Sequence, residues 1–302
     1  MRKTLLITAA ICILFAACDK GDEGNELTPP DSTVEPTKIP INISMGVWTR
    51  ATDAGFENND KAGIYVVNYN GSAAGTLAAS GNHVDNMRFT LTNAIWNPDT
   101  PIYWKDQTTK ADVYCYYPHT AGITTVAAYP FTVKTAQDVA ANYKASDFLW
   151  GKTSGVLSTA NPVQITVKHT MSSLLIYLKA GDGYTDVTLK AALKSIVVNN
   201  TRTGATIDLA TGAVTATGDV ANITPRAETD YYRALIVPQT ISDINLITVT
   251  VGDNSYALKQ SITFEANKQH KCTLTVNRIG NGINIGIGGW ETDNNDHGGT
   301  VN

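Results

Sequence analysis

Short segments rich in β-branched and aromatic residues recur along this chain and leave little room for helices. Gly, Pro and Asn turn residues separate them, as in residues 62–67, 111–117, 163–167 and 247–251. Only residues 136–145 have the composition for one or two helical turns, and Asn142 with flanking Thr residues makes that helix marginal. Regularly spaced short strands with such turns predict an all-β chain built from antiparallel β-sandwiches.

Two segments of the chain have nearly the same strand sequence. Residues 41–48 read Ile-Asn-Ile-Ser-Met-Gly-Val-Trp and residues 283–290 read Ile-Asn-Ile-Gly-Ile-Gly-Gly-Trp. Two segments that present the same apolar face can fill the same groove, so the second copy is a candidate partner for a neighbouring molecule. Coincidence between two short Ile- and Gly-rich strands is the alternative. Alternation places these residues on the shared face: Ile41, Ile43, Met45 and Val47 in the first copy, Ile283, Ile285 and Ile287 in the second.

The first residues predict an export signal that is cleaved. A basic start precedes an apolar run over residues 5–15, which is too short to span a bilayer as a helix. Ala16 and Ala17 then precede Cys18, an order that resembles a bacterial lipobox in which the cysteine becomes the lipidated first residue. Ordinary cleavage near Ala17 is the alternative. We therefore expect a lipoprotein signal peptide over residues 1–17.

Composition then suggests the domain organisation. Gly, Pro, Thr and acidic residues dominate residues 18–38, which predicts a flexible tether. Within it, residues 31–33 (Asp-Ser-Thr) are either a short O-glycan acceptor or bare tether. Residues 153–162 form the best internal boundary. The expected domains are an N-terminal sandwich over 39–157 and a C-terminal sandwich over 158–278, followed by a strand and polar tail over 279–302.

Charge and cysteine placement limit the possible partners. Loss of Arg2 and Lys3 with the leader shifts the formal net charge from −4 to −6, and no Lys/Arg cluster is present to neutralise phosphates. Nucleic acid is therefore not an expected partner. Cys12 leaves with the leader and Cys18 is assigned to lipid. Cys115 and Cys272 lie in apolar strands in different halves, where we expect buried free thiols.

No catalytic, cofactor or metal motif emerges from the sequence. The five histidines are far apart and form no pair at metal-ligand spacing, so His169 is expected to be a hydrogen-bonded structural residue. Residues 293–298 resemble the start of a calcium loop, but no twelfth-position Glu follows. No nucleophile elbow occurs, and the glycines of residues 280–286 open no helix. We therefore expect neither an enzyme nor a bound cofactor or metal.

Several stretches in order resemble the fimbrillins, the subunits of type V pili on outer-membrane anaerobes. The matching residues are 48–53, 55–66, 111–118, 147–150, 167–172, 234–239 and the Ile-x-x-Trp that ends at Trp290. Residues 18–23 also resemble the lysine-plus-acid tag of lipoproteins sent to the outer face of the outer membrane in Bacteroides-type bacteria, with Gly21 as an interruption. The resemblance implies two tandem transthyretin-like β-sandwiches and export as an acylated (palmitate-type) lipoprotein.

The resemblance also implies roles for the repeated strand. A surface protease specific for arginine would cut after Arg50, so that Ala51 begins the assembled subunit and the first strand is displaced. A solvated surface arginine is the alternative for Arg50. The donor strand for the next subunit would carry Ile283, Ile285, Ile287 and Trp290. The alternatives are an ordinary last strand of the second sandwich and, for Trp290, a core aromatic instead of a pocket plug.

The expected function is that of a structural or adhesive subunit of a cell-surface pilus, located in the outer membrane and the fimbrium. Its expected partners are further copies or related fimbrillins in a head-to-tail polymer, an Arg-specific protease, the membrane through the lipid, and a host or bacterial surface ligand. One alternative is a glycan-binding lipoprotein of a polysaccharide-utilisation system, with Trp96, Tyr103 and Trp104 exposed to stack on sugars. The other is a glycosidase, but no spacing singles out a carboxylate pair.

Overall fold

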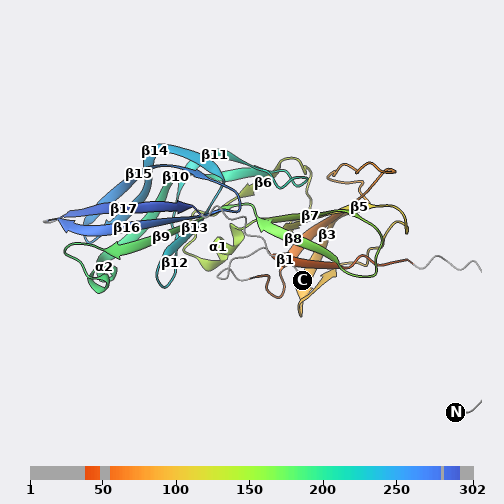
Figure 1. Ribbon diagram of the computed structural model, residues 1–302, viewed down its shortest axis with the longest axis horizontal. Coiled ribbons are helices and arrows are strands. Elements are labelled where there is room, and N and C mark those ends of the chain that lie inside the picture. The colour runs from red at the N-terminus through yellow and green to blue at the C-terminus, as the bar shows by residue number, and fades with distance from the viewer. Residues whose placement is uncertain (1–37, 48–54, 280–281, 293–302) are drawn as a thin grey trace, which may run out of the picture. The chain divides into compact units, whose positions relative to one another are not determined.

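The computed structural model describes residues 38–47, 55–279 and 282–292, which form three β-sheets and two short helices (Figure 1). This confirms the all-β expectation. The predicted signal peptide, Cys18, Arg50 and Ala51 lie outside the described residues. Within them, no helix is both long and apolar enough to cross a bilayer.

The first half of the chain forms a seven-stranded sheet in the order β1-β8-β7-β5-β2-β3-β4. All neighbours run antiparallel except β1 and β8, which are parallel. The bounds of these strands are β1 Ile43–Val47, β2 Lys61–Asn68, β3 Val84–Thr92, β4 Ile95–Pro98, β5 Ala111–Tyr117, β7 Leu149–Val156 and β8 Val163–His169.

The central strands of this sheet are buried on both faces, which is why β2 and β5 read as apolar runs without alternation. Ile64 and Val113 point into a core shared with β1 and β8. Tyr65 and Tyr114 point to the other face, into a core that continues into the second half of the chain. The first half is therefore packed on both sides of one sheet.

The second half contains two five-stranded sheets. One has the order β11-β10-β14-β15 with β6 paired to β10, and the other has the order β12-β13-β9-β16-β17, in which β9 and β16 run parallel. The bounds are β6 Tyr129–Thr132, β9 Ser172–Ala180, β10 Leu193–Ile207, β11 Val214–Ile223, β12 Arg226–Ala227, β13 Tyr232–Ile236, β14 Gln239–Val251, β15 Asn254–Phe264, β16 Gln269–Ile279 and β17 Gly282–Thr292.

Strands on the two sides of the expected domain boundary pair with one another. The predicted boundary between residues 157 and 158 falls between β7 and β8, which are neighbours in the same sheet. Conversely, β6 belongs to the N-terminal half in sequence but pairs with β10 in the second half. Long-range pairing of this kind leaves no local signal in the sequence.

The helices are short. α1 (Ala140–Ala145) lies inside the segment that was expected to be marginally helical. α2 (Asp186–Ala192) was not expected, although Thr185 and Thr188 form a capping box at its start. Cys115 and Cys272 are buried and free, as predicted, and burial raises the pKa of both thiols, that of Cys272 to about 12.

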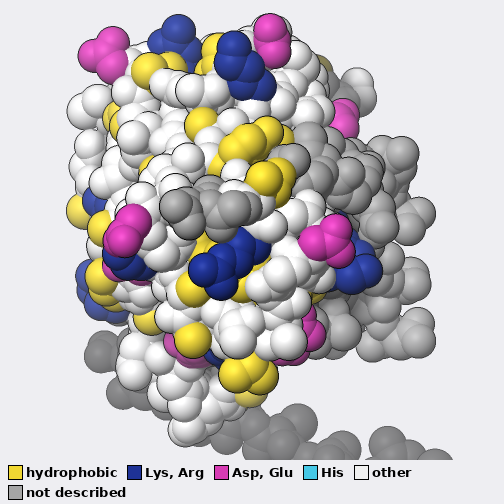
Figure 2. Space-filling view, turned by 90° about the vertical axis from the view of Figure 1, so that its left-hand side faces the viewer, with side chains coloured by type: hydrophobic (Ala, Val, Ile, Leu, Met, Phe, Trp, Pro, Cys, Tyr) yellow, Lys and Arg dark blue, Asp and Glu magenta, His cyan; other side chains and the backbone are white. Residues whose placement is uncertain are grey.

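The face drawn in Figure 2 carries Lys and Arg side chains interspersed with Asp and Glu, with small hydrophobic groups between them. The coloured side chains on this face therefore build up no field of one sign.

Candidate functional site

The first strand lies between two other segments of the N-terminal half. Along one edge, Ile43–Val47 pairs in parallel with residues 163–167 of β8, and the Val163 N–H donates to the Asn42 carbonyl at 2.8 Å. Along the other edge, the Ile41 N–H donates to the Ile102 carbonyl at 2.9 Å, and the Trp104 N–H donates to the Ile39 carbonyl at 3.0 Å. Residues 39–47 therefore close the gap between β8 and the segment that follows β4.

The side chains of this strand follow the alternation predicted from the sequence. Ile41 and Ile43 are 2% and 5% exposed, whereas Asn42 between them is exposed. Met45 is half-buried, and its Sδ accepts a hydrogen bond from the Cys115 Sγ at 3.0 Å. The side chain of Val47 lies outside the described residues. Burial of the two isoleucines stabilises this arrangement by about 1.5–3 kcal/mol for each side chain.

The second copy of the repeated strand lies elsewhere in the same chain. β17 pairs antiparallel with β16 at the end of a five-stranded sheet, with Ile285 opposite Val276 and Ile287 opposite Leu274. Ile283 is half-buried and packs against the core of the second half. The side chains of Ile285, Ile287 and Trp290 lie outside the described residues. The two copies thus belong to different sheets of one chain.

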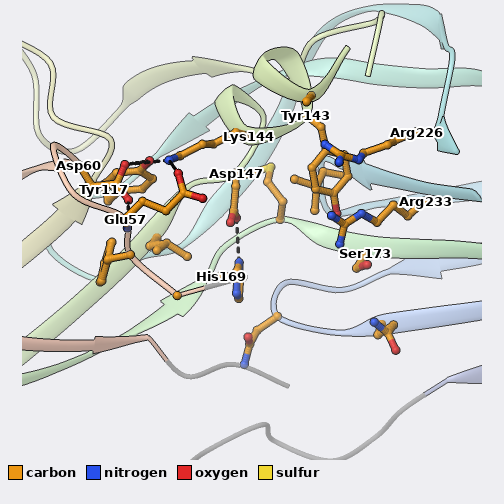
Figure 3. A pocket seen from close by; sticks show the side chains of 18 of the residues that line it. Glu57, Asp60, Tyr117, Tyr143, Lys144, Asp147, His169, Ser173, Arg226 and Arg233 are labelled. Carbon is orange, nitrogen blue, oxygen red and sulfur yellow. Dashed lines mark hydrogen bonds and ion pairs between the residues drawn. The ribbon is translucent and has the colours of Figure 1, made fainter. Parts of the chain in front are cut away.

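A cavity of about 490 Å³ lies beside residues 55–60 and takes its lining from both halves of the chain (Figure 3). Phe56 and Tyr117 contribute from the first half, and Met171, Ser173 and Leu235 contribute from the second. Phe56 packs edge-to-face against Trp96 and Tyr117, with ring centroids 4.9 and 5.4 Å apart. Aromatic packing therefore holds Phe56 against the first sheet.

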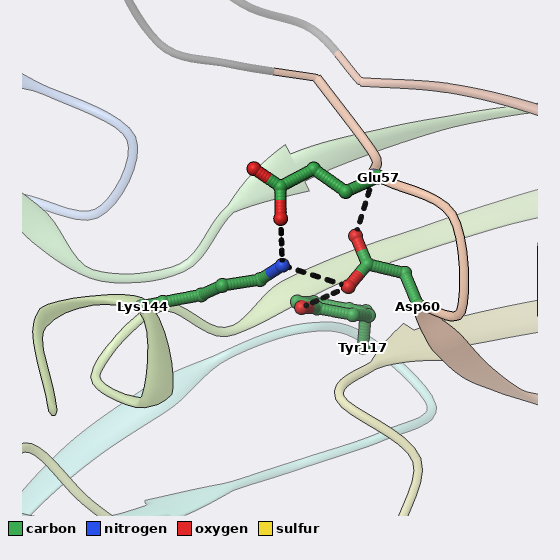
Figure 4. Close-up of polar contacts among 4 residues, drawn as sticks. All are labelled: Glu57, Asp60, Tyr117 and Lys144. Atoms are coloured by element: carbon green, nitrogen blue, oxygen red, sulfur yellow. Dashed lines mark hydrogen bonds and ion pairs between the residues drawn. The ribbon is translucent and has the colours of Figure 1, made fainter. Parts of the chain in front are cut away.

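Four polar side chains form a network on one wall of this cavity (Figure 4). Lys144 of α1 places its Nζ 2.7 Å from Glu57 Oε2 and 2.9 Å from Asp60 Oδ1. Asp60 is buried, and it also accepts from the Tyr117 hydroxyl at 3.0 Å and from the Glu57 N–H at 2.8 Å. Desolvation lowers the pKa of Lys144, but the bonds from Glu57 and Asp60 outweigh it and raise that pKa above its usual value. The network ties residues 57–60 to α1.

Loss of Lys144 should destabilise the fold because it removes the cation that compensates a buried carboxylate. We expect Lys144→Met to lower the free energy of unfolding by about 1–3 kcal/mol. Lys194→Met is the matched control, since its partner Asp253 is 97% exposed and the change should cost no more than about 0.5 kcal/mol. Urea denaturation of the three chains measures this, and equal losses in both variants would contradict a special role for Lys144.

The neighbouring residue of α1 faces the second half of the chain. The Arg233 guanidinium lies 4.4 Å from the centroid of the Tyr143 ring, and that of Arg226 lies 6.0 Å from it. Both arginines place Nε within 2.9 Å of Glu228 Oε1. α1 therefore carries Lys144 toward residues 57–60 and Tyr143 toward the β12–β13 arginines, a juxtaposition that spans the cavity in Figure 3.

The expectation for His169 is confirmed, whereas that for the exposed aromatic residues is mostly wrong. His169 Nδ1 lies 2.8 Å from Asp147 Oδ1, which confirms the expected hydrogen-bonded role. The expectation that three aromatic residues form an exposed platform for sugars is wrong for two of them. Trp96 and Trp104 are each only 6% exposed, and only Tyr103 is exposed. The tryptophans are buried because both take part in the core that β1 completes.

Sequence reasoning missed the cavity and its polar network. Glu57 and Lys144 are 87 positions apart, so no motif links them. Among the described residues, no group of three or more His, Cys, Asp or Glu side chains is placed to hold a metal ion.

Comparison with known proteins gives a consistent result. Residues 49–290 match the family model described as fimbrillin-like. A candidate cell adhesion protein from Bacteroides uniformis ATCC 8492 shares 21% identity and a TM-score of 0.66, over 85% of this chain and 98% of that one. A second, from Bacteroides ovatus ATCC 8483, shares 15% identity and a TM-score of 0.66, over 84% and 96% of the two chains. A fimbrial protein from the same Bacteroides ovatus strain shares 16% identity and a TM-score of 0.50, over 78% of this chain and 48% of that one. These structural likenesses show the fold alone, and no curated protein sequence matches significantly.

Proposed function

Because the chain belongs to the fimbrillin-like family, we propose that it is a structural or adhesive subunit of a cell-surface pilus, polymerised by exchange of its first strand. The family is one of fimbrial subunits and not of enzymes. Membership supports assembly with other fimbrillin subunits in a cell-surface fimbrium.

The observation that carries the strand-exchange proposal is the setting of β1. Residues 43–47 pair along one edge with β8, and residues 39–41, just before them, bond to residues 102–104. The apolar face of the segment, which includes Ile41 and Ile43, completes a core. Its removal would open a groove lined by Val163 and Ile165, which are 4% and 1% exposed. The second copy, with Ile283 and Ile285 at the positions of Ile41 and Ile43, has the side-chain order to refill that groove.

Processing and anchoring complete the proposal. Export as a lipoprotein would attach the chain to the outer membrane through Cys18, and an Arg-specific surface protease would cut between Arg50 and Ala51. The cut falls after Val47, the last residue of β1, and before Gly55, where the described chain resumes. It would therefore separate β1 from the chain, while the Phe56 contacts and the Lys144 network still hold residues 56–60 against the fold.

The N-termini of the protein in different cell fractions test this proposal. In the membrane fraction we expect a lipid-modified peptide that begins at Cys18, and in purified fibres we expect a peptide that begins at Ala51. Mass spectrometry of both fractions identifies the N-terminal peptide. Arg50→Ala should block the cut. Arg88→Ala is the matched control and should not affect the cut, because Arg88 is ion-paired with Asp99 in the fold. Fibre subunits that begin at Cys18 would sink the processing step for this chain.

A further inference from the structure

Strand exchange would bring two distant parts of the molecule together. In the register of the repeat, Gly282 of one copy takes the place of Pro40 in the next copy, where Pro40 is bridged to Tyr103. Ile279, the last residue of β16, precedes Gly282 by three positions. Three Cα–Cα steps span at most about 11 Å, so Ile279 of the donor copy has to lie next to the entrance of its neighbour's groove.

Two exposed apolar side chains mark the end of the molecule that carries Ile279. Ile279 is 57% exposed, and Val187 of α2 is 78% exposed, the highest value among the large hydrophobic side chains that the structure describes. α2 lies beside the end of β16 (Figure 1), and shortly before this helix the Asp182 carbonyl accepts from the Arg278 N–H at 2.7 Å. When β17 leaves its sheet, β16 keeps its pairing with β9 as far as Val276. We call Val187 and Ile279 the end patch.

The entrance of the groove carries a second pair of exposed apolar side chains. Tyr103 and Leu157 are 40% and 48% exposed. Trp104, which follows Tyr103, donates its backbone N–H to the Ile39 carbonyl at 3.0 Å and its Nε1–H to the Thr159 carbonyl at 3.1 Å. These bonds hold the segments that contain Tyr103 and Leu157 next to the place where the first strand begins. We call Tyr103 and Leu157 the entrance patch.

We propose that the end patch of one copy packs against the entrance patch of the next copy, as a second contact beside the exchanged strand. This contact rests on the proposed strand exchange, which places the two patches next to each other. Seven large hydrophobic side chains are exposed in the part of the chain that the structure describes, and four of them form these patches; the others are Ile95, Val139 and Val220. Burial of the four side chains removes apolar surface from water and so stabilises the joint between successive subunits.

Val187→Asp tests the contact without disturbing the fold. Val187 lies in the first turn of α2, where a carboxylate is favourable, and its side chain is largely exposed. We expect this variant to unfold like the wild type but to give about threefold to tenfold less polymer after Arg-specific cleavage, because a charge is placed against an apolar surface. Val220→Asp is the matched control, since Val220 is 55% exposed, lies on β11 and belongs to neither patch. Gel electrophoresis without boiling measures the yield, which should equal that of the wild type in the control.

A lysine on the entrance patch should reverse the loss. We expect Val187→Asp with Tyr103→Lys, or with Leu157→Lys, to regain most of the yield, because opposite charges attract across the joint. Val187→Asp with Tyr103→Asp should lose more, because like charges repel. The proposed contact is overturned if the wild type forms ladders and Val187→Asp polymerises as well as Val220→Asp, or if neither lysine variant regains yield. A wild type that forms no ladders overturns strand exchange, and the contact with it.

Discussion

A chain that ends at Asn281 is expected to stay folded but to remain monomeric after Arg-specific cleavage, under conditions in which the full chain forms ladders. The truncation removes β17, which lies at the end of its sheet, and leaves β16 held by its parallel pairing with β9. Loss of an edge strand costs stability without removing the core around Leu274 and Val276, which are fully buried. Circular dichroism measures folding, and gel electrophoresis without boiling measures polymer size.

Point variants separate the donor role from the stability of the second half. Ile285→Asp should lower polymer yield at least tenfold, because an unpaired carboxylate in the groove costs several kcal/mol and 1.4 kcal/mol is already a factor of ten. Asn284→Asp adds the same charge at the position equivalent to Asn42, which is exposed, and should have a mild effect. If the truncated chain polymerises as well as the full chain, or unfolds outright, β17 is not a donor.

The sequence predicted those features that depend on local pattern. Alternation over residues 41–45 gave the buried face of β1, and the apolar context of Cys115 and Cys272 gave their burial. The α2 helix was missed because it is only seven residues long and buries a single side chain, that of Leu189. Thr185 at the N-cap, followed by Asp186 in the first turn, was a readable start signal. Local rules therefore recover strands and their faces better than short exposed helices.

Features that depend on distant partners were not predictable. The pairing of β8 with β1 joins residues about 120 positions apart, which is why a boundary drawn at residue 157 separates two strands of one sheet. Burial of Trp96 and Trp104 follows from the same closure, since both belong to the core that Ile41 and Ile43 complete. The arginines that line the cavity likewise come from β12 and β13 and meet Tyr143 of α1, and only the fold brings these segments together.

The register of the exchanged strand follows from the pairing of β1. Ile43 lies opposite Val163, and Ile285 takes the place of Ile43 in the repeat. If the donor enters as β1 does, the Cα atoms of Ile285 and the neighbouring subunit's Val163 should lie about 4.8 Å apart, within the range of about 4.4–6.8 Å for a disulfide. A Val163→Cys, Ile285→Cys chain that begins after Cys18 should therefore form covalent ladders on oxidation, only after Arg-specific cleavage.

Two matched pairs fix the interpretation of this cross-link. Asn284→Cys with Val163→Cys should not cross-link, because residue 284 points to the opposite face of the strand. Ile287→Cys with Val163→Cys should not cross-link either, because residue 287 lies about 6.6 Å beyond residue 285 along the donor strand. Cys272 does not compete, since burial raises the pKa of its thiol and leaves little thiolate at neutral pH. Cys115 contacts Met45 of the displaced strand, so these chains also carry Cys115→Ala. Ladders from the Ile287 pair alone would shift the register of the donor strand by two residues. If none of the pairs forms ladders, the repeated strand does not take part in assembly.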